Sequence, residues 1–179
     1  MVCRGAVSLL LLSLLLVSVP ASAQWIENGT PYTGFAGDIT ARRAVPDGYG
    51  GILVLTGHTG ASGPGYLFLE RIDGYGRLVM TAHIDGPGAF GSRLAADGAG
   101  GAIVAAVKGN DLYAYRVDAA GSLAWGAGGV LVSGAGDTLA SPSLAADGAG
   151  GCFVVWQDMR TDAGDIYAQH ILDTGAAGW

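Results

Sequence analysis

An eight-residue segment repeats in this chain at a fixed interval. The segment LAADGAGG begins at Leu94 and again at Leu144, and a degenerate copy, AVPDGYGG, begins at Ala44. Each copy carries an aspartate, and these aspartates are spaced by 50 residues: Asp47, Asp97 and Asp147. Such a period is typical of repeat architectures, in which one unit cannot bury its apolar face alone and packs against copies of itself. The repeat therefore constrains the fold far more than it constrains the activity.

The third copy shows the anatomy of one unit most clearly. Short apolar or alternating runs, separated by glycine-rich turns, predict four strands: Gly129–Val132, Ser143–Ala146, Cys152–Gln157 and Asp165–Leu172. Four short strands joined by hairpins within about 50 residues are typical of a propeller blade. We therefore expect an all-β fold, a β-propeller-like array of four-stranded antiparallel blades with about three repeats.

The repeated turns themselves call for particular residues. An aspartate that opens a glycine turn commonly accepts hydrogen bonds from backbone N–H groups two or more residues later. We interpret Asp47, Asp97 and Asp147 in this way, with metal binding as the less favoured alternative. The last glycine of each turn also holds a fixed repeat position: Gly51, Gly101 and Gly151.

Each copy has a second turn, after its last predicted strand, that ends in a glycine: Gly76, Gly121 and Gly175. A large side chain follows each of these glycines by four residues: Met80, Trp125 and Trp179. We interpret this position as a core residue that docks one repeat against the next, since its large apolar area favours burial. Ligand stacking is the alternative. The position also divides the chain into three modules, at about residues 25–79, 80–124 and 125–178.

Three modules are fewer than the four to eight blades that are typical of closed propellers. Two explanations stay open: the chain is the N-terminal part of a longer protein, or modules of several chains associate to close a ring. We favour the first explanation, an incomplete propeller that ends at Trp179. In either case, further blades or self-association are expected.

The first 23 residues have the pattern of a secretory signal peptide. Arg4 precedes an apolar run, and the small residues Ala21, Ser22 and Ala23 stand where a signal peptidase would cut. An uncleaved membrane anchor is the alternative, but the run is short for a bilayer span. We expect a mature repeat domain of residues 24–179 that is secreted, periplasmic or on the cell surface, with no stable membrane insertion.

Charge and cysteine content exclude several classes of function. The formal net charge is −6, and Lys108 is the only lysine, which argues against a nucleic-acid partner. Without the signal segment, Cys152 is the only cysteine, so no intramolecular disulfide is expected. Its apolar surroundings favour a buried core residue over a nucleophile.

The third copy also resembles a known family. The string DGAGGCFVVWQDMRTDAGDIYAQHILDTGAAGW, residues 147–179, resembles secreted bacterial β-propeller repeats with the pattern D-G-x-G-G, W-x-D-x-R, D-I-Y-A-Q and D-x-x-G-x-x-x-W. The segment LYAYRVDAAGSLAW of the second copy is similar to quinone-dehydrogenase-type propeller repeats and, more distantly, to Asp-box repeats. The first copy lacks the W-x-D-x-R segment and the tryptophan. The resemblance implies an extracellular propeller-like module of bacterial origin.

One interstrand loop carries a candidate metal site. Asp158, Asp162 and Asp165 place three carboxylates close together in the sequence, and hard oxygen ligands of this kind can bind Ca²⁺. The alternative, which we favour, is that Arg160 pairs with one carboxylate while Asp165 caps the hairpin. Calcium is the only cofactor that the sequence suggests.

Two classes of function remain. The first is a binding or scaffold module whose varied loops, Gly57–Gly65, Lys108–Asp111 and Asp158–Gly164, contact an extracellular protein or glycan. The second is the N-terminal part of a propeller enzyme, either glycan-cleaving or quinone-dependent. Glu27 and Glu70 are the only glutamates, and no catalytic constellation is evident, so we expect the binding module.

Overall fold

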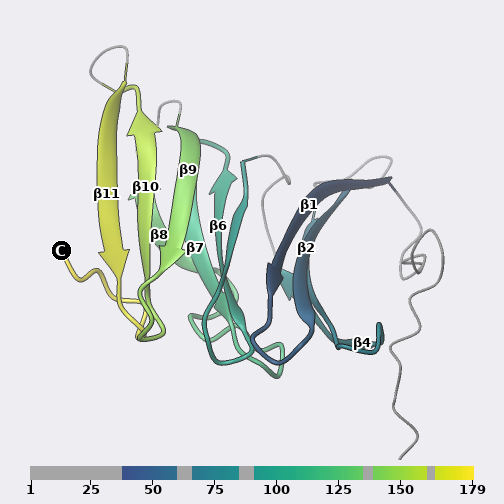
Figure 1. Ribbon diagram of the computed structural model, residues 1–179. Helices are drawn as coiled ribbons and strands as arrows, with labels where there is room; N and C mark the ends of the chain where they lie inside the picture. Colours follow the sequence, from purple (N-terminus) through teal and green to yellow (C-terminus); the bar gives the residue numbers. More distant parts are fainter. Residues whose placement is uncertain (1–37, 60–65, 85–90, 135–138, 161–163) are drawn as a thin grey trace, which may run out of the picture.

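The computed structural model describes residues 38–59, 66–84, 91–134, 139–160 and 164–179 of this 179-residue chain. The predicted signal peptide, residues 1–23, lies outside these residues. Within them, strands form three antiparallel sheets and no helix is present, so the predicted all-β class is confirmed (Figure 1).

Consecutive strands pair with one another in every sheet. The first sheet, called sheet A, contains β1 (Asp38–Pro46), β2 (Ile52–Thr59), β3 (Tyr66–Ile72) and β4 (Leu78–Ile84). Sheet B contains β5 (Arg93–Ala96), β6 (Ala102–Lys108), β7 (Asp111–Val117) and β8 (Val130–Gly134). Sheet C has three described strands, β9 (Leu139–Ala146), β10 (Cys152–Asp158) and β11 (Asp165–Ile171).

The strand predicted at Gly129–Val132 does not belong with the three strands that follow it in the sequence. It forms β8, which pairs with β7 through the register Ala114↔Val130 and Tyr113↔Leu131. After the turn at Asp118, the chain bridges back through Leu123 to Val117, and this return path delivers β8 to sheet B. The prediction that this strand forms one blade with β9–β11 was therefore wrong. The first predicted strand of the third sequence repeat is the last strand of sheet B.

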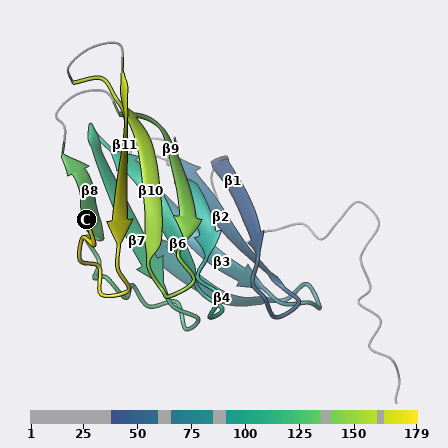
Figure 2. The same ribbon diagram turned by 60° about the vertical axis from the view of Figure 1, so that its left-hand side comes forward.

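The three sheets pack face to face in a row, with sheet B in the middle (Figures 1 and 2). One core lies between sheets A and B and joins Leu53, Leu69 and Met80 to Val104 and Tyr115. A second core lies between sheets B and C and joins residues such as Ile103 and Leu112 to Val154 and Trp156. The first strands of the sheets are neighbours, since β5 contacts both β1 and β9.

Burial along the strands follows from this order. In β6 every residue from Ala102 to Ala106 is buried, because both faces of sheet B are covered. In β10 and β4, buried and exposed residues alternate, because one face of each strand packs toward sheet B and the other face of that strand is more open.

The loops predicted for recognition lie at the ends of the β2–β3, β6–β7 and β10–β11 hairpins. Strand β6 extends through Lys108 and β7 begins at Asp111, so this loop is a two-residue connection with Gly109 at φ +62°. Residues 60–65 and 161–163 of the other two loops lie outside the described residues. The prediction that these loops make contacts with a partner stays a prediction.

Candidate functional site

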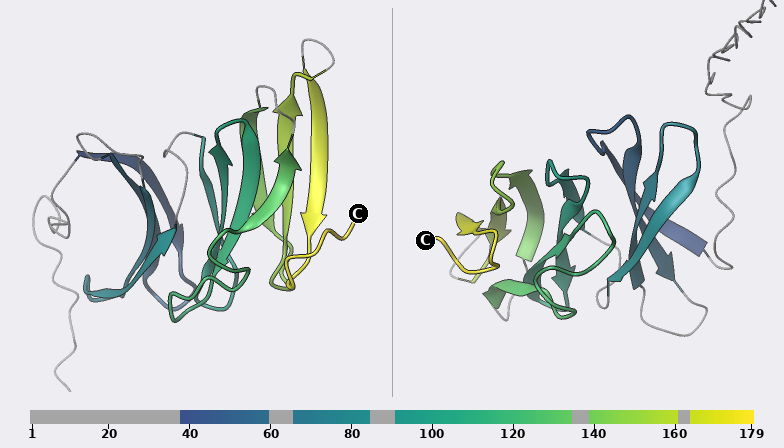
Figure 3. Two further views of the ribbon diagram at one scale, coloured as in Figure 1. Left: turned by 180° about the vertical axis from the view of Figure 1, so that it is seen from behind. Right: turned by 90° about the horizontal axis from the view of Figure 1, so that it is seen from below.

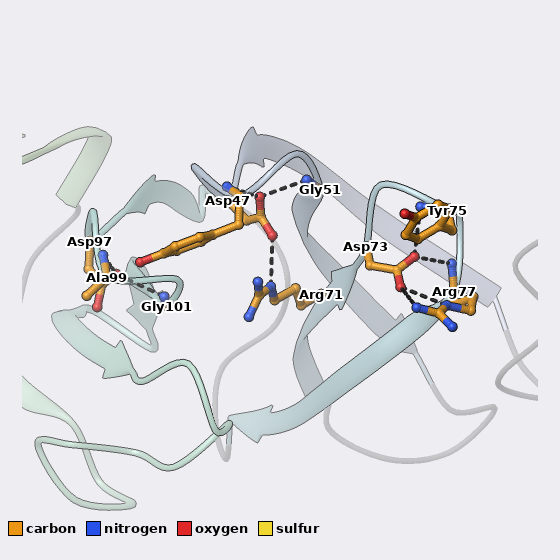
Figure 4. Close-up of polar contacts among 10 residues, drawn as sticks. Asp47, Gly51, Arg71, Asp73, Tyr75, Arg77, Asp97, Ala99 and Gly101 are labelled. Atoms are coloured by element: carbon orange, nitrogen blue, oxygen red, sulfur yellow. Dashed lines mark hydrogen bonds and ion pairs between the residues drawn. The ribbon is translucent and has the colours of Figure 1, made fainter. Parts of the chain in front are cut away.

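The three repeated turns connect the first two strands of each sheet and lie at the same end of the molecule (Figures 1 and 3). In the first turn, Oδ1 of Asp47 accepts hydrogen bonds from the N–H groups of Tyr49 and Gly51, at 2.7 and 2.8 Å (Figure 4). Asp97 holds Ala99 and Gly101 in the same way. This is the arrangement that the Asx-turn interpretation predicts.

The third turn repeats the pattern. Oδ1 of Asp147 accepts from the N–H groups of Ala149 and Gly151, at 2.7 and 2.9 Å. A methyl group on Gly151 would collide with the carbonyl oxygen of Ile171 and come within 2.6 Å of Oδ2 of Asp147. The same clash with a strand carbonyl exists at Gly51 and Gly101, so the last turn position has no room for a side chain.

The second carboxylate oxygen of each turn aspartate faces a basic side chain from the third strand of its sheet. Nε of Arg71 donates to Oδ2 of Asp47 at 2.8 Å, and Nε2 of His170 lies 2.9 Å from Oδ2 of Asp147. Burial disfavours the ionised form of Asp47, but hydrogen bonds from Tyr49, Arg71 and Gly51 outweigh that cost and lower its pKa. The hydrogen bond from His170 lowers the pKa of Asp147.

The middle pair is looser. Nη2 of Arg116 lies 3.6 Å from Oδ2 of Asp97, and Nη1 lies 3.5 Å from the carbonyl oxygen of Asp173. Its Nε is buried and has no hydrogen-bond partner in the described part of the chain. The Nε–H group of Arg71 donates to its turn aspartate, whereas that of Arg116 makes no hydrogen bond in the described part of the chain.

The sequence reasoning missed these basic partners, although a signal was present. Arg71 precedes Ile72–Asp73, and Arg116 precedes Val117–Asp118. The pattern R-[I/V]-D therefore recurs at the end of the third strand of sheets A and B. In the third copy His170 precedes Ile171–Leu172, and Leu172 replaces the aspartate. The three positions face equivalent residues of the neighbouring strand, through the pairs Leu53↔Arg71, Ile103↔Arg116 and Phe153↔His170.

A groove of about 470 Å³ lies between the second and third turns. Its walls are the two turns, Ala96–Ala99 on one side and Ala146 with Gly148–Gly150 on the other, and Arg116 lines it between them. Gly98 and Gly148 have φ near +80°, and a methyl group on either would meet no described atom within 4 Å. The groove thus combines the backbone of two turns with one guanidinium, whose contact with Asp97 is 3.6 Å long.

Comparisons with protein-family models, curated proteins and solved structures found no match. In the described part of the chain, no helix is long and apolar enough to cross a membrane.

The large side chains at the predicted docking position contact the next sheet in two cases. A methyl group on Gly121 would lie 3.1 Å from Cγ of Met80, and one on Gly175 would lie 3.1 Å from Cδ1 of Trp125. Nε1 of Trp125 also donates to the carbonyl oxygen of Asp173, at 2.8 Å. These contacts are those of inter-repeat docking. Trp179 stands at the same sequence position and is 65% exposed.

The candidate calcium ligands are only partly described. Asp158 is buried, and its carboxylate accepts a hydrogen bond from Nε of Arg160 at 2.9 Å and forms a 2.7 Å ion pair with Nη2. Asp165 begins β11 directly opposite Asp158, whereas Asp162 lies outside the described residues. Burial disfavours ionised Asp158, but the contacts with Arg160 and Trp156 outweigh it and lower the pKa.

Among the described residues, no group of three His, Cys, Asp or Glu side chains could hold a metal ion. The ion pair between Arg160 and Asp158 is the alternative to calcium that we favoured from the sequence, and both carboxylate oxygens of Asp158 contact Arg160. The calcium site stays a prediction because one of its three ligands is not described.

Two buried titratable groups lie away from the turns. Cys152 is fully buried, and burial raises the pKa of its thiol to about 12, as expected for an unreactive core residue. Glu70 is 1% exposed, and burial raises its pKa to about 7. Oγ1 of Thr56 lies 3.4 Å from Oε2 of Glu70, while Oε1 has no hydrogen-bond partner in the described structure.

Proposed function

We propose that this chain is an extracellular binding or scaffold module built as a propeller-like array, and that it holds a glycan or protein group in the groove beside Arg116. The observation that carries the proposal is the guanidinium itself, which lines the groove, belongs to a side chain that is 21% exposed and contacts Asp97 only at 3.6 Å. A guanidinium in this state suits a carboxylate or a hydroxyl oxygen of a ligand.

The propeller-like arrangement has support of its own. The sheets are meanders of short antiparallel strands, they pack face to face, and their first strands lie side by side. Strands in this order, with the innermost strands of successive blades adjacent, are the anatomy of a propeller. The resemblance of residues 147–179 to secreted bacterial repeats supports an extracellular location.

The alternative is part of a propeller enzyme, glycan-cleaving or quinone-dependent. Its best candidate group is Glu70, because a carboxyl with a pKa of about 7 can act as an acid or base near neutral pH. Glu70 is 1% exposed, however, and a catalytic carboxyl must reach the bond that it acts on. The accessible groove therefore favours binding.

The test is a screen of the purified chain against a glycan microarray and a panel of extracellular proteins, followed by two matched variants. Ala149 and Ala120 are both exposed, and the N–H group of each donates to a turn aspartate, but only Ala149 lines the groove. Ala149→Glu places a carboxylate in the groove next to Arg116 and should abolish binding, whereas Ala120→Glu should retain it.

Equal binding by the two variants would show that the groove is not the site. Hydrolysis of a glycosidic substrate, or reduction of a quinone, that disappears in Glu70→Gln would support the enzyme instead.

A further inference from the structure

The first repeated turn carries an aromatic ring that the second and third turns lack. The third residue of the turn is Tyr49 in the first copy, Ala99 in the second and Ala149 in the third. Cζ of Arg71 lies 5.5 Å from the centre of the Tyr49 ring, which is the distance of a cation–π contact. A methyl group on Gly100, in the turn of the next sheet, would lie 3.2 Å from Cε2 of Tyr49. The ring therefore packs on an arginine of its own sheet and against a turn glycine of the next sheet.

The groove beside Arg116 has the same partners but no ring. Arg116 is the counterpart of Arg71, and Gly150 is the counterpart of Gly100. A methyl group on Gly150 would lie 3.0 Å from Nη1 of Arg116, and one on Gly100 would lie 3.6 Å from Nη1 of Arg71, so both arginines reach the turn of the next sheet. Ala99 stands where the ring would be attached. Ala99, Arg116 and Gly150 all line the groove of about 470 Å³.

The exposure of these residues agrees with a missing ring. Gly100 is buried, whereas Gly150 is only partly buried. The side chain of Arg116 is 21% exposed and lines the groove. A ring that enters the groove can therefore contact the guanidinium and cover Gly150, as the Tyr49 ring contacts Arg71 and packs against Gly100.

We propose that the groove beside Arg116 binds an aromatic side chain of a partner protein, a tyrosine above all, with the ring on the guanidinium and against Gly150. The occupant is a tyrosine because the equivalent space between the first two turns holds a tyrosine ring on an arginine. A guanidinium is attracted to the negative face of an aromatic ring, and aliphatic side chains and sugar rings have no such face. The inference rests on the proposed function and names its ligand as a protein that presents an exposed tyrosine.

The experiment follows the binding of N-acetyltyrosinamide to the purified chain by NMR spectroscopy. The signals observed are those of the Nε–H group of Arg116 and the backbone N–H groups of Ala149 and Gly150. An aromatic ring stacked beside these groups shifts their signals through its ring current, which N-acetylleucinamide cannot do. We expect saturable shifts with the tyrosine derivative and an affinity at least about threefold lower for the leucine derivative.

Two variants exchange the properties of the two spaces. Ala99→Tyr supplies from within the chain the ring that the first turn already has, so it should abolish binding of N-acetyltyrosinamide. Tyr49→Ala should create a second site of the same kind, with shifts at Arg71 and Gly100. Ala120→Tyr is the matched control, because the N–H group of Ala120 donates to a turn aspartate in the same way but Ala120 does not line the groove. All three substituted residues are exposed, and circular dichroism checks that the variants keep the β fold.

Three results would overturn the proposal: no shift in the wild type at the highest concentration, equal affinities for the tyrosine and leucine derivatives, or binding that Ala99→Tyr leaves unchanged. Absence of a second site in Tyr49→Ala would overturn it too, since the first two turns are its model. Failure of the proposed function is a separate result. A glycan that binds the wild type and Ala120→Glu but not Ala149→Glu would keep the groove as the site and refute tyrosine as its ligand.

Discussion

At the scale of single residues, the repeated aspartate organises each turn with both carboxylate oxygens. Oδ1 of Asp47 holds two backbone N–H groups of the turn, and Oδ2 takes Arg71 from the third strand. A hydrogen bond to an ionised group is stronger than one between neutral groups. One side chain therefore closes a hairpin and connects it to the third strand of the sheet, which accounts for an aspartate at this position in all three copies.

The glycines of one turn should differ sharply in their tolerance of alanine. Gly148 has φ +80° with open space around it, so Gly148→Ala should cost about 1–2 kcal/mol through backbone strain alone. Gly151→Ala forces a methyl group into the Ile171 carbonyl and the Asp147 carboxylate, and should cost more than about 3 kcal/mol. Urea unfolding of the two variants measures both; equal losses would contradict the steric role of the last turn glycine.

Glu70 should make stability fall as the pH rises. Burial raises its folded pKa from the ordinary 4.5 to about 7, so the folded state holds the proton more tightly than the unfolded state. Stability contributed by the protonated form is full below pH 4.5 and is lost as the pH rises to about 7, by on the order of 3 kcal/mol.

Glu70→Gln cannot ionise and should remove this part of the pH dependence. Unfolding midpoints of the wild type and the variant, measured across this pH range, should converge at low pH and separate at neutral pH in favour of the variant. Parallel curves would contradict the assignment.

At the scale of elements, the docking side chains join one sheet to the next. Trp125 contacts Gly175 and donates a hydrogen bond to Asp173, both in the turn region that follows β11. Trp179 has the same place in the repeat but is largely exposed. The two tryptophans therefore cannot be distinguished by their position in the repeat, but they differ in exposure and in their contacts with the next sheet.

Trp125→Ala should therefore destabilise the chain by about 2 kcal/mol or more, through lost burial and a lost hydrogen bond. Trp179→Ala should change stability by less than about 0.5 kcal/mol, as most exposed substitutions do. Thermal unfolding of dilute samples, in which association is weakest, compares them. A larger loss in Trp179→Ala would mean that this tryptophan packs within its own chain.

The elements that could be predicted from the sequence are those with a strong local pattern. Apolar runs such as Cys152–Trp156 and the glycine turns at Asp97 and Asp147 predict strands and hairpins by themselves. The place of β8 could not be predicted, because a short apolar strand can pair with the strand before it or with the one after it. The contact of Arg116 with Gly150 also depends on packing between sheets B and C, which no local pattern specifies.

At the scale of the whole molecule, the order of the sheets should determine which parts open first. Sheet B contributes to both cores, whereas sheets A and C contribute to one core each. In a linear array, the stability of each unit is the sum of its own contribution and those of its interfaces with neighbours. Opening sheet B therefore exposes two interfaces, and opening sheet C exposes one.

Native-state hydrogen exchange should follow this order. Amides of β6 and β7 should exchange slowest, at rates near global unfolding. Those of β11, an edge strand among the described strands with four of its seven residues exposed, should exchange fastest. Trp125→Ala weakens only the interface between sheets B and C, so it should accelerate exchange in β9–β11 and leave β1–β4 unchanged. Acceleration of equal size in every sheet would instead mean that the three sheets unfold as one cooperative unit, with no separate interface energies to weaken.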